Sequence, residues 1–197
     1  MLAAGQVTAA ARGSIAPGWL KGFRRLDSPN ADQRPAHTRV ELLVIHYISL
    51  PPGRFSGNAI EQLFCNQLDC SAHPAYAPLR GLRVSAHFLI RRRGHCLQFV
   101  SADARAWHAG QSRFQGRQRC NDFSIGVELE GDGEHRFTQA QYRRLAGLTM
   151  VLAQHYPLAF VAGHSDIAPQ RKDDPGPFFD WPRYLASVES ARLIRPF

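Results

Sequence analysis

The sequence predicts a single α/β domain of the α+β kind, in which helices flank a mixed central β-sheet. Its 197 residues suit one domain with a sizeable hydrophobic core. Apolar, β-branched runs alternate with segments of helical period, the pattern expected when helices pack on a sheet. We expect the domain to span residues 38–188, between an irregular N-terminal arm at 1–37 and a C-terminal tail at 189–197.

The clearest predicted strand is 40–48, which is almost entirely apolar and rich in β-branched residues. Such a run is typical of a strand that is buried on both faces. It carries His46 near its carboxyl end, where strands of a sheet often contribute a side chain to a site. A histidine that is only a satisfied member of the core is the alternative interpretation.

The next segments predict a short helix, a long loop and a hairpin. Residues 58–64 place apolar side chains on one helical face. Residues 65–81 have mixed polarity and predict a long loop, of the kind that often serves as a lid or binding loop. Residues 84–90 and 96–100 are apolar and flank the basic turn 91–94, so they predict a β-hairpin.

A further strand is predicted at 123–131, where apolar and polar residues alternate. A buried carboxylate without a partner is costly, so Glu128, in the middle of this strand, is a candidate catalytic group. Glu130, at its end, is expected to reach solvent. The polar face of the strand comprises Ser124, Gly126, Glu128 and Glu130.

Two helices and a short strand complete the predicted fold. Thr138 and Gln141 form a capping-box pattern at the start of a helix that continues to about Tyr156. Residues 160–163 predict a short strand. Asp180 is the expected N-cap of a C-terminal helix.

The segment 163–177 holds a histidine, a lysine, three aspartates and three prolines. Its prolines and charges indicate a rigid loop rather than a core strand or an amphipathic helix. His164 and Asp174 lie near its ends and, with His46, make a set of two histidines and one carboxylate. That set is typical of a hydrolytic zinc site with one open position, whereas an ordinary solvated loop is the alternative.

Hydrolysis of an amide also needs a proton carrier and a group that stabilises negative charge on the carbonyl oxygen. Glu128 is the candidate base, which takes a proton from the attacking water. Lys172, two residues before Asp174, is the candidate for stabilising the oxyanion, and a solvated loop lysine is the alternative. We expect one zinc ion per chain.

Composition excludes some classes of function. The net charge of +8 comes almost entirely from scattered arginines, which bind carboxylates as well as phosphates, so we expect no nucleic-acid partner. No apolar run is long enough to span a membrane. Residues 1–12 do not resemble a signal peptide, so we expect a cytoplasmic protein. We also expect a monomer. The four cysteines lack metal-binding spacing and are expected to be free thiols.

Several motifs, taken together, resemble the amidase_2 and peptidoglycan-recognition-protein superfamily over about residues 38–188. The resemblance implies a zinc amidase that cleaves the amide between (1,6-anhydro-)N-acetylmuramic acid and the L-alanine of the stem peptide. It also implies a role in cytoplasmic muropeptide recycling, which limits β-lactamase induction, and assigns zinc binding and catalysis to the five residues named above. The segments that carry the resemblance are 45–53, 83–87, 105–110, 120–131 and 163–177.

The same resemblance implies that Arg83, Trp107 and Arg119 line a groove for the muropeptide. Trp107 offers a flat face to a sugar ring, and the arginines hold peptide carboxylates. Packing in the core is the alternative role for Trp107. The chain departs from the family at Tyr47, which stands where an asparagine usually follows the strand histidine. This departure bears on how sugar or peptide is recognised, not on the zinc chemistry.

Two other functions compete with this interpretation. One is a peptidoglycan-binding module without catalysis, but members that only bind lack a zinc ligand, whereas this chain has all three. The other is an amidase that acts on the intact cell wall, against which the missing signal-peptide pattern argues.

Overall fold

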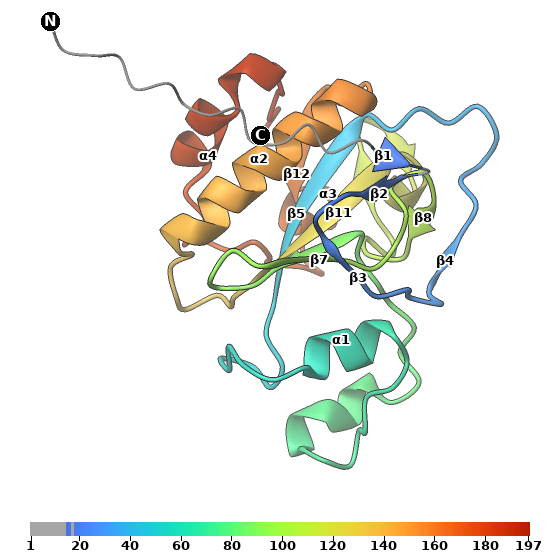
Figure 1. Ribbon diagram of the computed structural model, residues 1–197, viewed down its shortest axis with the longest axis vertical. Coiled ribbons are helices and arrows are strands. Elements are labelled where there is room, and N and C mark those ends of the chain that lie inside the picture. Colours follow the sequence, from blue (N-terminus) through green and yellow to red (C-terminus); the bar gives the residue numbers. More distant parts are fainter. Residues whose placement is uncertain (1–14, 17) are drawn as a thin grey trace, which may run out of the picture.

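Figure 1 shows the computed structural model, which describes residues 15–16 and 18–197. A six-stranded sheet forms its centre, in the order β12–β5–β11–β6–β7–β3. The first four of these strands are parallel neighbours, whereas β6 and β7 are antiparallel, so the sheet is mixed as predicted. The strands are β12 (Phe160–Gly163), β5 (Leu42–Ile48), β11 (Ser124–Glu130), β6 (Phe88–Ile90), β7 (Cys96–Gln98) and β3 (Arg24–Arg25).

Helices and short ladders surround this sheet, and α2 crosses one of its faces with α4 beside it (Figure 1). The α-helices are α1 (Ala59–Phe64), α2 (Gln139–His155), α3 (His164–Ile167) and α4 (Trp181–Ser187). The 3₁₀ turns are η1 (Pro74–Leu79), η2 (Cys120–Asp122) and η3 (Glu189–Ala191). The two-residue strands of the ladders are β1 (Ile15–Ala16), β2 (Trp19–Leu20), β4 (Ala31–Asp32), β8 (Arg105–Ala106), β9 (Arg113–Phe114) and β10 (Arg117–Gln118).

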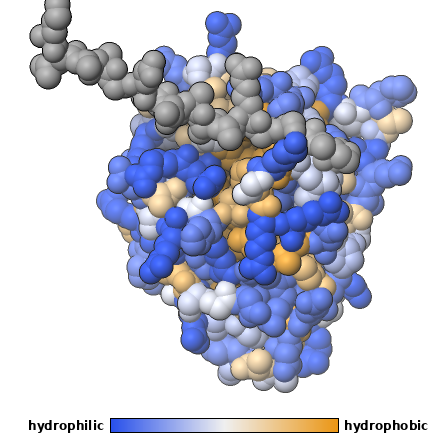
Figure 2. Space-filling view, in the orientation of Figure 1, coloured by the Kyte–Doolittle hydropathy of each residue, from blue (hydrophilic) through white to orange (hydrophobic). Residues whose placement is uncertain are grey.

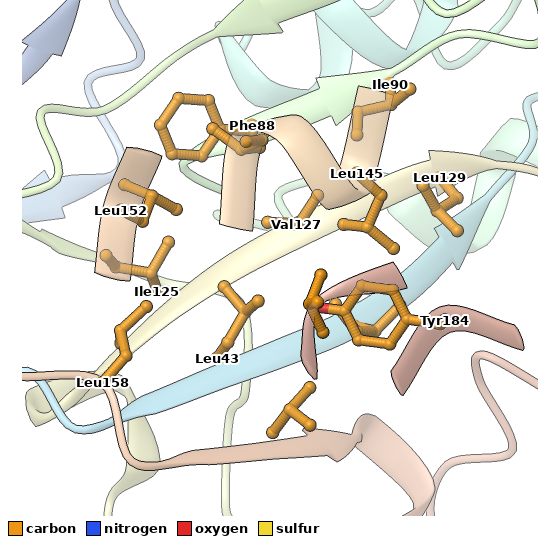
Figure 3. Close-up of a cluster of buried hydrophobic side chains, with 14 of the residues drawn as sticks. Leu43, Phe88, Ile90, Ile125, Val127, Leu129, Leu145, Leu152, Leu158 and Tyr184 are labelled. Carbon is orange, nitrogen blue, oxygen red and sulfur yellow. The ribbon is translucent and has the colours of Figure 1, made fainter. Parts of the chain in front are cut away.

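The largest hydrophobic cluster lies between the sheet and helices α2 and α4 (Figure 3). Leu43 of β5 and Val127 of β11 point into it and are fully buried, as is Leu145 of α2. Because side chains alternate along a strand, the neighbours of these strand residues face the other side. That second face is covered by the chain around residues 109–123 and by α3.

The register of the parallel strands sets the position of the candidate site. Glu128 lies directly opposite His46, and Gly163 lies opposite Ile45. His164 follows Gly163 and so emerges next to His46 at the carboxyl edge of the sheet. Ligand sites in open sheets with parallel strands form at this edge.

The predicted helix starts are confirmed. The hydroxyl of Thr138 accepts the N–H of Gln141 at 3.1 Å, and the side chain of Gln141 accepts the N–H of Thr138 at 3.0 Å. Asp180 accepts the N–H of Arg183 at 3.0 Å and so caps α4. These bonds satisfy N–H groups that the first turn of a helix leaves without partners.

The described part of the N-terminal segment is more ordered than an irregular arm. It adds β3 to the edge of the central sheet and pairs β4 with β8. Arg34 donates to the backbone carbonyls of Asn121 at 3.0 Å, Asp122 at 2.9 Å and Ser124 at 2.9 Å. This guanidinium therefore ties the segment to the start of β11.

Three local predictions need correction. Glu130 is buried rather than solvated, because Arg91 forms an ion pair with it. The strand predicted at 84–90 begins only at Phe88, since Ser85 leaves the ladder and its N–H donates to the carbonyl of Trp107 at 3.1 Å. The segment 163–177 is not entirely a loop, because its first residues form the helical turn α3.

The visible surface in Figure 2 is mainly hydrophilic, with apolar atoms gathered in a central strip. Among the described residues, no helix has the length and apolarity needed to cross a bilayer. All four cysteines are free thiols, as expected.

Candidate metal centre

Three buried side chains converge at the carboxyl edge of the sheet. Nδ1 of His46, on β5, lies 3.0 Å from Nδ1 of His164, at the start of α3. Oδ2 of Asp174 lies 2.9 Å from the first nitrogen and 3.1 Å from the second. These residues are 1%, 3% and 6% exposed, so solvent reaches them very little. The structure thus brings together the two histidines and the carboxylate that the sequence singled out.

This set of donor atoms fits zinc. Nε2 of His164 lies 3.1 Å from the carbonyl of Ala109, its acceptor, so Nδ1 is the ring nitrogen on the side of Asp174. Burial, and then the nearby His164, lower the pKa of His46 to about 4, so this ring is neutral near pH 7. Burial acts to raise the pKa of Asp174, but contacts with His164 and His46 outweigh it and hold that pKa below its ordinary value. Two imidazoles and one carboxylate are the protein ligands of many catalytic zinc sites.

Glu128 faces the same centre from β11, the strand beside β5. The residue is buried, and its Oε2 atom has no hydrogen-bond partner among the described residues. Burial and the charge of Asp174 raise the pKa of Glu128 well above its ordinary value, whereas Lys172 acts in the opposite direction. A buried carboxyl with a raised pKa and an unpartnered oxygen is suited to exchange protons with a reactant.

Lys172 and Tyr47 flank the centre. Lys172 is exposed, and its positive charge acts on both Glu128 and His46. Tyr47 follows His46 on β5 and is half-buried. Burial and interaction with the carboxylate of Asp173 raise the pKa of Tyr47 to about 12, so the phenol stays neutral. Tyr47 therefore connects β5 with the loop that carries Lys172.

Hydrogen bonds and an ion pair brace the segment 163–177. The N–H of Ser165 donates to the carbonyl of Asp174 at 2.8 Å and joins the two ends of the segment. Asp166, in α3, forms an ion pair with Arg195 at 2.9 Å. These contacts, together with the prolines, restrict the backbone of the segment.

The remaining predicted substrate-binding residues differ in exposure and in the part of the surface that they line. Trp107 follows β8 and is half-buried. Its backbone N–H donates to the hydroxyl of Ser85 at 3.0 Å. Arg119 is exposed, with a left-handed backbone at φ 61°, and pairs with Asp122 at 3.3 Å. Arg83 is also exposed. The two arginines line different shallow hollows of the surface.

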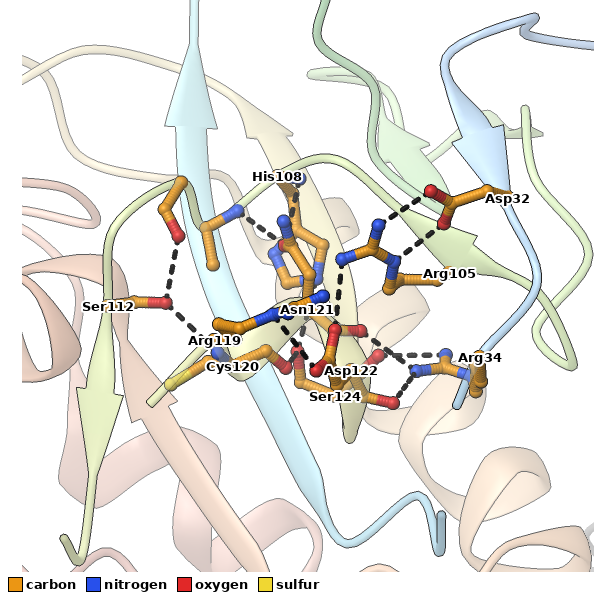
Figure 4. A network of polar contacts seen from close by, with 12 residues as sticks. Asp32, Arg34, Arg105, His108, Ser112, Arg119, Cys120, Asn121, Asp122 and Ser124 are labelled. Atoms are coloured by element: carbon orange, nitrogen blue, oxygen red, sulfur yellow. Dashed lines mark hydrogen bonds and ion pairs between the residues drawn. The ribbon is translucent and has the colours of Figure 1, made fainter. Parts of the chain in front are cut away.

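Three residues without a predicted role support the centre. Nδ1 of His108 lies 2.9 Å from Nε2 of His46. Oδ1 of Asn121 accepts the N–H of His108 at 3.1 Å and that of Ala109 at 2.8 Å (Figure 4). Arg171 donates to the carbonyl of Ala109 at 2.7 Å. These contacts fix the chain segment against which both histidine ligands rest.

A signal for His108 does exist in the pattern of β11. Ser124 and Gly126 are small and lie on the same face as Glu128, so this face leaves room for a side chain from another segment. Asn121 and Arg171 leave no such signal, because both bind the backbone of residues distant from β11.

Comparison with known proteins relates the chain to one family. Residues 36–177 match Amidase_2, described as N-acetylmuramoyl-L-alanine amidase. The chain is 55% identical to the 1,6-anhydro-N-acetylmuramyl-L-alanine amidase AmpD of Escherichia coli K12, over 87% of this chain and 94% of that protein. It is 51% identical to AmpD of Haemophilus influenzae, over 89% of this chain and 97% of that protein.

Solved structures give the same relationship. The crystal structure of a selenomethionine derivative of AmpD superimposes with a TM-score of 0.87 at 53% identity, covering 89% of this chain and 99% of that one. A complex of the amidase AmiD from E. coli with the substrate anhydro-N-acetylmuramic acid-L-Ala-D-γ-Glu-L-Lys gives a TM-score of 0.57 at 31% identity. That match covers 79% of this chain and 60% of the other.

Proposed function

Because the chain belongs to the N-acetylmuramoyl-L-alanine amidase family, we propose that it hydrolyses the amide between N-acetylmuramic acid and the L-alanine of the stem peptide. Released muropeptides with the 1,6-anhydro sugar are its substrates. The AmpD relatives are named as 1,6-anhydro-N-acetylmuramyl-L-alanine amidases, which supports this choice of substrate. The reaction adds water across the carbon–nitrogen bond and yields a lactyl carboxylate and a free L-alanine amine.

His46, His164 and Asp174 hold one zinc ion in this proposal. Zinc polarises the substrate carbonyl and lowers the pKa of water to about 7. The protein's own contribution is to keep three donor atoms within 2.9–3.1 Å of one another in a site that solvent barely reaches. The enzyme acts as a monomer in this proposal.

Glu128 is the proton carrier. Its unpartnered Oε2 takes a proton from the attacking water and delivers it to the nitrogen of the leaving L-alanine. The raised pKa of Glu128 suits both steps, because the carboxyl can accept a proton and hold it until the amide bond breaks.

Lys172 stabilises the negative charge that develops on the carbonyl oxygen. An ammonium group at the rim of a buried site can stabilise an oxyanion, because the positive charge faces the oxygen on which negative charge develops. Lys172 lowers the pKa of Glu128, whereas Asp174 raises it. This effect of Lys172 supports the position of its ammonium group near the reacting groups.

Trp107, Arg83, Arg119 and Tyr47 recognise the muropeptide. The indole of Trp107 stacks on a sugar ring, and the exposed guanidinium groups of the two arginines bind stem-peptide carboxylates. Tyr47 replaces the amide that is usual at this position with a phenol, and its neutral hydroxyl keeps a hydrogen-bonding group there. We place the reaction in the cytoplasm, in muropeptide recycling that lowers β-lactamase induction, as the resemblance seen in the sequence implies.

One observation carries the proposal: Glu128 lies opposite His46 on adjacent parallel strands, beside two further donors from a single rigid segment. The direct test measures zinc content and turnover of an anhydro-muramoyl tripeptide for the wild type and Glu128→Ala. We expect one zinc per chain in both proteins and turnover only in the wild type.

The other outcomes of this test separate the competing functions. Zinc without turnover of any muropeptide would indicate a binding module. Faster release of peptides from intact peptidoglycan than from the tripeptide would indicate a wall-lytic amidase. Protein purified without chelators that carries no zinc would overturn the metal centre.

A further inference from the structure

A line of hydrogen bonds runs from the metal centre into the protein interior. Nε2 of His46 lies 2.9 Å from Nδ1 of His108, and Nε2 of His108 lies 3.2 Å from the hydroxyl of Ser124. That hydroxyl donates to the carbonyl of Cys120 at 2.6 Å. Figure 4 shows the inner part of this line. The three side chains are 1%, 8% and 0% exposed, so they bond to one another rather than to bulk water.

The donor in each of these hydrogen bonds follows from the last bond of the line, between Ser124 and Cys120. A carbonyl oxygen can only accept, so the one hydroxyl proton of Ser124 points to Cys120. Ser124 must then accept a proton from Nε2 of His108. The ring of His108 is buried and has no carboxylate among its hydrogen-bond partners, so it holds a single proton, because an uncompensated buried charge is costly.

The same logic sets the state of His46. Since His108 uses its only ring proton toward Ser124, its Nδ1 carries a lone pair and accepts from Nε2–H of His46. When Nε2 of His46 donates to His108, Nδ1 is the nitrogen of the neutral ring that is left to bind a metal. This Nδ1 atom lies 3.0 Å from Nδ1 of His164 and 2.9 Å from Oδ2 of Asp174.

We propose, on the basis of the proposed zinc function, that His108 is a positioning residue, which holds His46 in the tautomer that can bind the metal through Nδ1. Histidine ligands usually donate their second ring nitrogen to a fixed acceptor, and this contact orients the ring and raises its basicity. In this chain that acceptor is another imidazole, whose own tautomer is set by Ser124.

The fold gives His108 a dedicated place. The ring packs edge-on against His46, with centroids 5.1 Å apart and planes at 83°. A Cβ atom at Gly126 would collide with the ring of His108, so only glycine at this position of β11 admits the imidazole. Asn121 holds the backbone on either side through the N–H groups of His108 and Ala109.

The two residues His108 and Ala109 together orient both histidine ligands. The side chain of the first accepts from His46, and the carbonyl of the second accepts from Nε2 of His164 at 3.1 Å. No substitution removes that carbonyl, but the contact to His46 depends on the side chain. His108 is therefore the position at which this support can be tested.

The experiment compares two substitutions of His108 in the full-length chain. His108→Phe keeps a ring but removes the acceptor, whereas in His108→Asn the amide oxygen takes the place of Nδ1. Zinc affinity is measured by competition with a chelator, and the ring protonation of His46 by ¹⁵N NMR after zinc removal. We expect His108→Phe to bind zinc about 10- to 100-fold more weakly and to lose the pure Nε2–H tautomer of His46. His108→Asn should keep the tautomer and stay within a few-fold of the wild type.

His87→Asn is the matched control. His87 is also fully buried, and its ring lies 5.6 Å from that of His108. Its nitrogens contact the N–H of Gly126 at 3.0 Å and the carbonyl of Ala104 at 3.1 Å instead of a ligand. This variant should bind zinc like the wild type, even if its thermal stability falls.

Several outcomes would overturn the proposal. One is a His108→Phe protein with wild-type zinc affinity and an unchanged His46 tautomer. Another is a His108→Asn protein that loses as much affinity as His108→Phe. If His108→Phe does not fold, Ser124→Ala replaces it, and we expect that variant to show mixed tautomers of His46. A wild type that takes up no zinc would refute the proposed function, whereas the NMR result alone would still decide the role of His108.

Discussion

The two faces of strands β5 and β11 are equally buried but contain different kinds of side chain. On the helix-covered face, Leu43 and Val127 are 0% exposed and belong to the largest hydrophobic cluster. On the site face, His46 and Ser124 are 1% and 0% exposed and are polar. Alternation along the two strands therefore places the polar residues of the site on one face only, where they lie beside the apolar residues Leu42 and Val44 of a second core cluster.

The difference shows how a polar face can be buried at acceptable cost. Buried polar groups are tolerated when hydrogen bonds replace those to water. His46 and Ser124 both have partners, whereas Oε2 of Glu128 has none among the described residues. This buried, unpartnered oxygen belongs to the candidate proton carrier, so its substitution should affect catalysis, whereas substitutions on the helix-covered face should affect stability.

The largest expected effect is on the site face. Glu128→Gln keeps the shape of the side chain but cannot carry a proton, so amidase turnover should fall by about 10²- to 10⁴-fold. The free energy of unfolding should not fall, because the substitution removes a buried carboxyl whose Oε2 has no partner. Steady-state kinetics and urea unfolding measure the two properties. Glu130→Gln is the matched control, and because its partner is Arg91, it should lower stability and leave turnover intact.

On the helix-covered face the pattern should reverse. Leu145→Ala removes a fully buried side chain of α2 and should cost about 2–5 kcal/mol of unfolding free energy. Turnover per folded molecule and zinc content should stay at wild-type values. A loss of zinc from the folded variant would mean that the two faces are coupled, against the separation described here.

A smaller effect is expected at the rim of the site. Lys172→Ala should lower turnover by about 10²-fold with little change in zinc content, because the ammonium acts on the reacting oxygen rather than on the metal. Lys21, the other lysine of the chain, is exposed and provides the control. Equal turnover for Lys172→Ala and Lys21→Ala would exclude the oxyanion role.

The smallest effect is expected at the start of α2, the helix that covers one face of the sheet. Thr138→Ala removes the capping-box hydroxyl of α2 and should cost about 1 kcal/mol of stability. Thermal unfolding and the kinetic assay together should show a lower Tm with unchanged turnover. A change in KM would show that the start of α2 influences substrate binding.

The sequence predicts those parts of the fold that depend on local patterns. The apolar run of β5 and the alternation of β11 locate the two central strands, and the Thr138–Gln141 pair marks the start of α2. The concentration of charge and proline in the segment 163–177 indicates a functional segment. The convergence of His46, His164 and Asp174 was predicted as a ligand set, and the structure places the three side chains together.

Features that depend on distant partners were not predictable. Glu130 looks like a solvated strand end, and only the fold brings Arg91 to it, 39 residues away in sequence. Strands β3 and β4 have two residues each, too few for any periodicity to be seen. The role of His108 depends on the gap left by Gly126 and on the register of β11 with β5.

The most direct test of the metal centre is a crystal structure of the full-length protein with anomalous scattering recorded at the zinc edge. The account predicts one anomalous peak, about 2 Å from Nδ1 of His46, Nδ1 of His164 and a carboxylate oxygen of Asp174, with Glu128 nearby but not a ligand. A peak coordinated by other residues, or by Nε2 of either histidine, would contradict it.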